Sequence, residues 1–341
     1  MLFMRLIKIF SFVFIFVISI QGFSQSKQIQ ILHSGNKISL RGLSVVNDDI
    51  IWVSGNNGMI GKSINGGNTF EWIKVKGFEK RDFRDIEAFD KNTAIIMGVD
   101  APAIILKTLD GGKNWKKVLE DSTKGMFLDA MDFSDSKNGV VIGDPIDQRV
   151  YLSSTKDQGE TWQKLDPKPG SNSLKVKTGE AFFASSGTNI KMLGKKLAFV
   201  SGGLSSRFYY LNSWDEIPML QGKESTGANS IAMNQKMQGI IVGGDFMQDT
   251  NRIENCVLFE IGQDIVYYKP IVAPHGYRSC VCFLTNEIAI SCGTSGVDIS
   301  SNGGKNWELI STEGFHVVQK AKKGKSVFLA GSNGRIAKLI F

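Results

Sequence analysis

Polar side chains recur at one position of a repeated pattern in this chain, and several of them are charged. Seven short apolar stretches end in glycine, and counting back 14 residues from each glycine reaches a polar residue in six of the seven. The residues at this position are Arg41, Arg84, Asp129, Thr188, Asn229, Ser279 and Val317, and Arg278 and His316 directly precede the last two. Because a guanidinium offers a planar fork of donors to carboxylates and carbonyls, the pattern predicts a binding site for such groups.

Acidic residues are expected to join this site from the segments that follow the glycines. Asp144 and Asp245 lie within two residues of two of them. A longer interval before Gly202 indicates an inserted loop, 166–187, and long loops of this kind frequently carry function. The complete predicted site comprises Arg41, Arg84, Asp129, Asp144, Glu180, Asn229, Asp245 and Arg278.

Metal and thiol chemistry have little support in the sequence. The chain holds 3 His and 4 Cys, and their spacing does not match a zinc site. The cysteines are Cys256, Cys280, Cys282 and Cys292. Cys280 and Cys292 can face each other across a hairpin, so a disulfide and four buried thiols are both compatible with the sequence. We expect no metal ion and no cofactor.

The spacing of the glycines indicates which elements must position these side chains. The apolar stretches end at Gly55, Gly98, Gly143, Gly202, Gly243, Gly293 and Gly331, at intervals of 38 to 59 residues. Each interval matches one four-stranded blade of a β-propeller. The inner strand of each blade would begin near the recurring polar position, which places the predicted site at one mouth of the central channel. The same residues would also suit a plain channel lining, with Arg84 and Asp129 as an ion pair.

A second repeated element predicts the outer hairpin of four blades. It reads SINGGNTF at 63–70, TLDGGKNW at 108–115, TKDQGETW at 155–162 and SSNGGKNW at 300–307. In such turns an Asp or Asn side chain accepts backbone N–H bonds and a glycine adopts positive φ. The residues expected to have these structural roles, the aromatic ones by packing between sheets, are Asn65, Asp110, Asp157, Asn302, Trp115, Trp162 and Trp307.

These hairpins resemble the Asp-box repeats, also called BNR repeats, of sialidase-type propellers. The chain as a whole resembles the photosystem II assembly and stability factor family and its relatives in non-photosynthetic bacteria, through stretches such as FRDIEAFD at 83–90, GDPIDQR at 143–149 and GGDF at 243–246. The resemblance implies a helper in the assembly of a partner complex. The expected fold is an all-β, seven-bladed β-propeller of four-stranded antiparallel blades. Its ring would be closed by an N-terminal strand, 28–33, because an open ring leaves sheet edges unpaired.

The first residues have the features of a secretory signal. Arg5 and Lys8 precede an apolar run, 9–20, which is too short to span a bilayer and is followed by small residues suited to cleavage. We therefore expect a signal peptide at 1–24, a single propeller domain at 25–341 and export to the periplasm or the extracellular space. The formal net charge of +7 is modest, so neither nucleic acid nor stable membrane insertion is expected. We expect a monomer.

Three classes of function fit a propeller with this rim. The first is a binding or assembly module that takes a protein or glycan ligand at the channel mouth. The second is a sialidase-like glycoside hydrolase, in which the three arginines clamp a carboxylate, Tyr277 is the nucleophile and Glu180 activates it. The segment 83–86 lacks the proline of the sialidase motif and lies in the second unit instead of the first. The third is an oxidoreductase that uses the same face. The binding module is the prediction.

Overall fold

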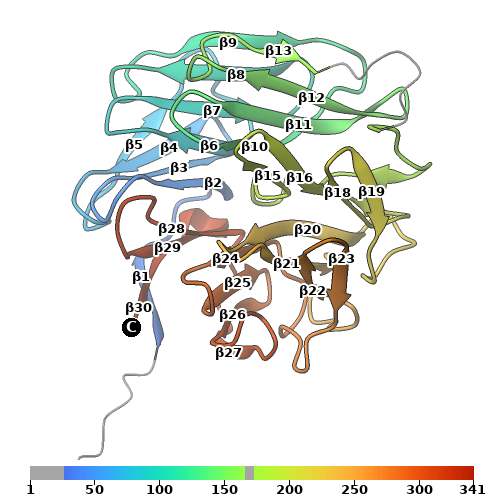
Figure 1. The fold of residues 1–341 in the computed structure, drawn as a ribbon. Coiled ribbons are helices and arrows are strands. Elements are labelled where there is room, and N and C mark those ends of the chain that lie inside the picture. The colour runs from blue at the N-terminus through green and yellow to red at the C-terminus, as the bar shows by residue number, and fades with distance from the viewer. Residues whose placement is uncertain (1–26, 166–172) are drawn as a thin grey trace, which may run out of the picture.

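Seven antiparallel β-sheets form a ring in the computed structural model of the chain (Figure 1). The structure describes residues 27–165 and 173–341. The predicted signal peptide, 1–24, and residues 166–172 of the predicted loop lie outside this part of the chain. Within the described residues the only helical element is a 3₁₀ turn, η1 (Ser332–Gly334). The predicted all-β, seven-bladed propeller is confirmed.

The first three blades each contain four consecutive strands. In order from the channel outward, blade one has β2 (Leu40–Val45), β3 (Ile51–Gly55), β4 (Met59–Ser63) and β5 (Glu71–Lys74). Blade two has β6 (Phe83–Ala88), β7 (Ala94–Gly98), β8 (Ala103–Thr108) and β9 (Lys116–Asp121). Blade three has β10 (Leu128–Phe133), β11 (Gly139–Ile146), β12 (Arg149–Thr155) and β13 (Gln163–Lys164).

The next three blades keep the same order. Blade four has β15 (Ile190–Leu193), β16 (Lys196–Val200), β18 (Arg207–Tyr210) and β19 (Ser213–Glu216). Blade five has β20 (Thr226–Met233), β21 (Gln238–Asp245), β22 (Cys256–Ile261) and β23 (Ile265–Tyr268). Blade six has β24 (Cys280–Phe283), β25 (Ala289–Gly293), β26 (Gly296–Ser300) and β27 (Glu308–Ser311).

The last blade joins the two ends of the chain. Its strands are β28 (Val317–Lys320), β29 (Val327–Ala330), β30 (Ile336–Ile340) and β1 (Gln28–His33). Gln28 pairs with Ile340 and Ile31 with Ala337, so the N-terminal strand is the outermost strand of the seventh blade, as predicted. Figure 1 shows β1 beside β30 close to the C-terminus. The inner strand β2 of blade one in turn contacts β28, which closes the ring.

Blade five differs from the four-stranded prediction because two short strands extend its sheet. These are β14 (Glu180–Ala181) and β17 (Gly202–Gly203), and β17 bridges β14 and β20. Gly202 pairs with Gly227, and a Cβ atom on Gly227 would lie 2.4 Å from the Cα atom of Gly202. Only two residues without side chains permit this approach.

The repeated glycines have a common packing role in four blades. A Cβ atom added at Gly55, Gly143, Gly243 or Gly293 would lie between 1.9 and 2.5 Å from the backbone carbonyl oxygen 16 residues earlier. That carbonyl stands two residues before the recurring polar position. The glycine therefore admits the chain that enters the inner strand at close range, which explains the fixed spacing of the two features.

The four predicted hairpins share one hydrogen-bond pattern. The side-chain oxygen of Asp110 accepts the backbone N–H of Asn114 at 2.9 Å, and the Thr108 hydroxyl accepts that of Gly112 at 3.0 Å. Equivalent bonds form at Asn65, Asp157 and Asn302. Trp115, Trp162 and Trp307 pack into the apolar layers between neighbouring blades. Each hairpin joins the third and fourth strands of its blade, away from the channel, as expected of a structural element.

Candidate binding site at the channel mouth

A cavity of about 430 Å³ lies at the end of the channel where the recurring polar residues gather. One wall carries polar side chains, namely Arg41, Arg84, Asn229, Tyr277 and His316. The facing set is aromatic and consists of Phe127, Phe182, Phe183 and Phe246. The site thus combines cationic and apolar surface, which suits an amphipathic ligand.

A β-bulge aims the recurring residue in four of the inner strands. In blade one, Leu40 pairs with Gly55 and Gly42 pairs with Ser54, which leaves Arg41 without a partner in the ladder. The same irregularity occurs at Arg84, Asp129 and Asn229. An extra residue re-aims its own side chain and bends the strand, and bulges are frequent beside functional sites. The bulge explains why polar residues are tolerated where an inner strand would favour valine or isoleucine.

Arg41 and Arg84 are neighbours at the mouth. Arg41 is half-buried, and its Nη1 atom donates to the carbonyl oxygen of Ser185 at 3.2 Å. Burial, followed by the positive charge of Arg84, lowers the pKa of Arg41. Arg84 pairs with Asp82 at 2.7 Å and lies over the Phe127 ring, 5.6 Å from its centre. Among the described residues, no carboxylate forms an ion pair with Arg41.

A buried hydrogen-bond network forms the floor beside the arginines. The Asn229 side-chain oxygen accepts hydrogen bonds from the Tyr277 hydroxyl at 2.8 Å and the Ser185 hydroxyl at 2.9 Å. Burial is the main reason that the pKa of Tyr277 rises to about 12. His316 contacts the hydroxyls of Ser39 and Ser332, and burial lowers its pKa to about 3, with a contribution from the two arginines. Tyr277 and His316 are therefore neutral at physiological pH.

Asp129 and Asp144 lie in the wall beside Arg84. Asp129 is fully buried, and neither of its carboxylate oxygens has a hydrogen-bond partner of normal geometry, although the backbone N–H of Ala184 is near. Asp144 is half-buried and accepts the backbone N–H of Phe182 at 3.0 Å. No ion pair joins Arg84 to Asp129, because Arg84 is bound to Asp82 instead. The expected lining pair is thus absent from the described residues.

Three residues of the predicted site lie elsewhere and do not line the cavity. Glu180 is buried in an ion pair with Arg207 and accepts the backbone N–H of Lys177 at 2.8 Å. Arg278 is fully buried, and its Nε atom donates to Asp298 at 2.6 Å. Asp245 is buried and accepts the backbone N–H of Met247 at 2.9 Å. All three predictions are wrong for one reason: a buried partner within the fold already satisfies each charge.

The inserted loop reaches deeper than a cover over the top face. Its last described part, 182–189, runs down the channel and contacts several blades. Phe182 and Ser185 line the mouth, Gly187 lies against the carboxyl group of Asp85, and Thr188 bonds to Ser230 at 2.7 Å. The aromatic wall is missing from the sequence prediction. The doublet Phe182–Phe183 within a polar insertion was the available signal for it.

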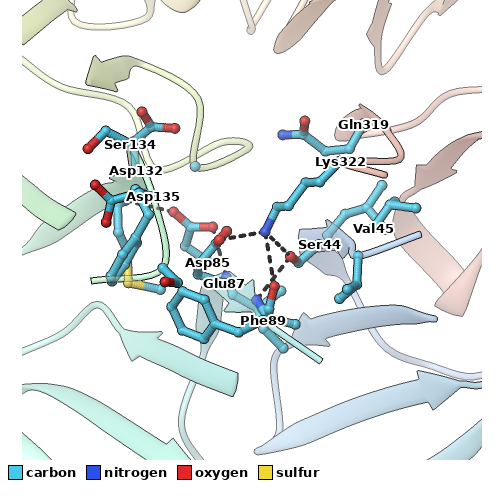
Figure 2. Close-up of a pocket in the computed structure, with 18 of the residues that line it drawn as sticks. Ser44, Val45, Asp85, Glu87, Phe89, Asp132, Ser134, Asp135, Gln319 and Lys322 are labelled. Atoms are coloured by element: carbon cyan, nitrogen blue, oxygen red, sulfur yellow. Dashed lines mark hydrogen bonds and ion pairs between the residues drawn. The ribbon is translucent and has the colours of Figure 1, made fainter. Parts of the chain in front are cut away.

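The opposite end of the channel opens into a second cavity of about 490 Å³, shown in Figure 2. Lys322 bonds there to Glu87, to the Ser44 hydroxyl at 3.0 Å and to the carbonyl oxygen of Ala88 at 3.0 Å. Lys191 pairs with Asp132 at 3.0 Å. These charges are paired between blades, so they stabilise the ring and leave few groups for a ligand.

Thiols and metal ligands do not form an obvious further site. The four cysteines are free thiols, and Cys280 lies directly opposite Cys292 in the β24–β25 ladder. Within 27–165 and 173–341 no group of three or more His, Cys, Asp or Glu residues could hold a metal ion. Across the same ranges no helix is long and apolar enough to cross a membrane.

Comparison with solved structures identifies propellers of the same architecture. A structure titled YCF48 bound to D1 peptide matches with a TM-score of 0.65 and 14% identity, over 92% of this chain and 95% of that one. YCF48 from Cyanidioschyzon merolae matches with a TM-score of 0.62 and 14% identity, over 91% and 98%. The similarity is one of fold. The WD40 propeller of Doa1 also matches, with a TM-score of 0.60, 14% identity and coverage of 92% and 97%.

Sequence comparison adds no closer relative. No protein-family model matches the chain, and no curated protein matches its sequence. The fold is therefore that of YCF48 and of WD40 propellers, both of which are used here only as structural neighbours.

Proposed function

We propose that this chain is an exported binding module that captures a peptide segment of a partner protein at the channel mouth. Arg41 receives a carboxylate of the peptide, with Arg84 beside it, and the aromatic wall packs an apolar side chain of the same peptide. Export rests on the N-terminal apolar run, and the module acts as a monomer. The observation that carries the proposal is Arg41, a half-buried guanidinium beside a second arginine, for which no described carboxylate is a partner.

Charge balance supports an anionic ligand group. Two adjacent guanidinium groups repel each other, and only Arg84 is neutralised by an acidic side chain, Asp82. A ligand carboxylate would relieve the repulsion and accept charge-assisted hydrogen bonds, which are about twice as strong as neutral ones. Neutral His316 and Tyr277 would line the site without adding charge.

The aromatic wall supports a peptide over a small ion. Phe246 is 43% exposed, and its ring lies 5.8 Å from Phe183 and 6.3 Å from Tyr277. Exposed aromatic rings gathered at a cavity are typical of recognition sites. One of the structural neighbours, YCF48, has been solved with a D1 peptide bound, which makes a peptide a reasonable ligand class for a propeller of this shape.

The enzyme alternatives have less support in the geometry. A sialidase-like clamp needs a third arginine, but Arg278 is bound to Asp298. The Tyr277 hydroxyl donates to Asn229, and Glu180, its expected activator, is held by Arg207. An oxidoreductase would need a docking slot for a cofactor. A glycan stays a second candidate ligand, since aromatic rings and arginines also suit acidic sugars.

A random peptide library displayed with free C-termini tests the proposal. The purified protein should enrich sequences that carry an acidic side chain or the C-terminal carboxylate next to an apolar residue. The double variant R41A/R84A should lose this enrichment. The double variant K113A/K236A is the control because it removes the same charge from two exposed loops on the far side of the blades. Enrichment that is equal in R41A/R84A and the native protein would reject the proposal.

A further inference from the structure

Asp129 is the most unusual charged residue near the mouth. It is fully buried, and its carboxylate oxygens lack hydrogen-bond partners of normal geometry. A buried ionised carboxylate without a partner costs several kcal/mol, which is why such groups are almost always paired. The β-bulge in β10 places this side chain beside Arg84 and Ala184, both of which line the mouth cavity.

A second carboxyl group, that of Asp144, stands next to Asp129. It is half-buried and faces the same wall, where its single hydrogen bond comes from the backbone of Phe182. Burial and the neighbouring Asp144 raise the pKa of Asp129 well above its usual value, and burial also raises the pKa of Asp144. In the absence of a ligand, Asp129 therefore keeps its proton.

The charged groups around the pair leave room for a cation. From β6 and the residues before it come Arg84 and Asp82, which are bound to each other at 2.7 Å. The segment 182–189 contributes no charged side chain, and Arg41 bonds to Ser185. Two carboxyl groups are thus present without a cation of their own, within the wall of a cavity that has two arginines nearby.

We propose that Asp129 and Asp144 form a cation subsite of the mouth cavity, which binds a lysine or arginine side chain of the captured peptide. The proposal rests on the proposed function, because the same peptide must supply both charges. Arg41 and Arg84 bind its anionic group, and the two aspartates bind its cationic group. The ligand class is then a segment with an acidic group, an apolar residue and a basic residue close together.

Binding of the cation is coupled to the loss of a proton. The ligand ammonium replaces the proton on the Asp129 carboxyl group, which leaves the O–H bond and passes to the buffer. A metal ion is a less suitable occupant, because the described residues contain no cluster of three or more ligands. Asp144 provides the entry, since it is the exposed member of the pair.

The same displayed peptide library separates this inference from the proposed function. The native protein should enrich peptides with both acidic and basic residues. D129N and D144N should lose the preference for basic residues and keep the preference for acidic ones, while R41A/R84A should show the reverse. D135N, at an exposed aspartate at the other end of the channel, is the charge-matched control.

Titration of one selected peptide gives the second measurement. Replacing its basic residue with glutamine should weaken binding to the native protein about 10-fold or more, the effect of losing a charged hydrogen bond, and leave binding to D129N unchanged. Calorimetry in two buffers of different ionisation enthalpy should detect release of a proton with the native protein and none with D129N. Thermal unfolding should show that D129N and D144N are folded.

The outcomes are distinct. Acidic enrichment without any basic preference, or a basic preference that survives in both D129N and D144N, would overturn the cation subsite and leave the proposed function standing. Absence of any peptide enrichment by the native protein would overturn both.

Discussion

Arg41 and Arg84 are adjacent residues at the mouth, and they differ in what already holds them. Arg84 has an acidic partner and an aromatic ring, whereas Arg41 has one carbonyl group. Removing Arg41 therefore leaves no acidic group unpaired, and removing Arg84 strands the buried Oδ1 side of Asp82 in a site that has lost its cation. The two positions should separate binding from stability.

We expect R41A to lower affinity for a selected acidic peptide at least 10-fold and to change the free energy of unfolding by less than about 1 kcal/mol. R84A should lower both, because Asp82 loses its partner. Fluorescence anisotropy with the peptide and urea unfolding measure the two quantities. A large loss of stability in R41A would show that its side chain is a structural part of the channel.

His316 makes stability depend on pH at the residue scale. Its folded-state pKa of about 3 is below the ordinary value of 6.5, so the unfolded chain binds a proton first as pH falls. The stability that neutral His316 provides is present above pH 6.5 and decreases toward pH 3, by about 1.4 kcal/mol for each pH unit.

The native protein should therefore lose about 2 kcal/mol more than H316Q between pH 7.5 and pH 5. Urea unfolding of both proteins at the two pH values gives this difference, and the variant serves as the control for all other titrating groups. Identical pH dependence of the two proteins would show that His316 is not neutral in the folded state.

At the scale of elements, the repeated glycine and the bulge form one device. The glycine at the end of the second strand admits the carbonyl that precedes the inner strand, and the inner strand then bulges at the residue that faces the mouth in four blades. Blade six keeps the close approach, where a Cβ atom on Gly293 would lie 2.0 Å from the Tyr277 carbonyl oxygen.

G293A should consequently destabilise the protein by about 3 kcal/mol or more, because backbone must move to admit the methyl group. G262A is the matched control, since the nearest atom to its Cβ would be 3.8 Å away. Its free energy of unfolding should change by less than about 1 kcal/mol. Chemical denaturation distinguishes them, and similar values for both variants would contradict the packing role of Gly293.

At the scale of the whole molecule, the ring is closed twice. The strand β1 completes the sheet of blade seven, and Lys322 of the same blade reaches across blade one to Glu87 and Ala88 of blade two. Closure removes the sheet edges that would otherwise invite association. The lysine contacts lie at the end of the channel opposite the proposed binding site (Figure 2).

K322M should lower the free energy of unfolding by about 1–2 kcal/mol, because Glu87 and the Ala88 carbonyl lose their shared donor. K323M removes a neighbouring exposed lysine and should have almost no effect. Peptide binding should be the same in both variants, since the two ends of the channel are separated by the segment 182–189. A loss of peptide binding in K322M would show that the ends are coupled.

The sequence by itself determined the architecture, because glycine spacing and turn residues act locally. The blade boundaries, the hairpins around Asp110 and Asp157 and the closing strand 28–33 all follow from residues close together in the chain. The same local reasoning located the inner-strand position of Arg41, Arg84, Asp129 and Asn229.

Only the tertiary structure decided which charges remain available at the mouth. Glu180, Asp245 and Arg278 have the right residue types and spacing, but their buried partners come from other segments. The aromatic wall depends in the same way on the insertion entering the channel. Whether a charge faces a ligand depends on which distant groups meet it first, and no periodicity of the sequence records those encounters.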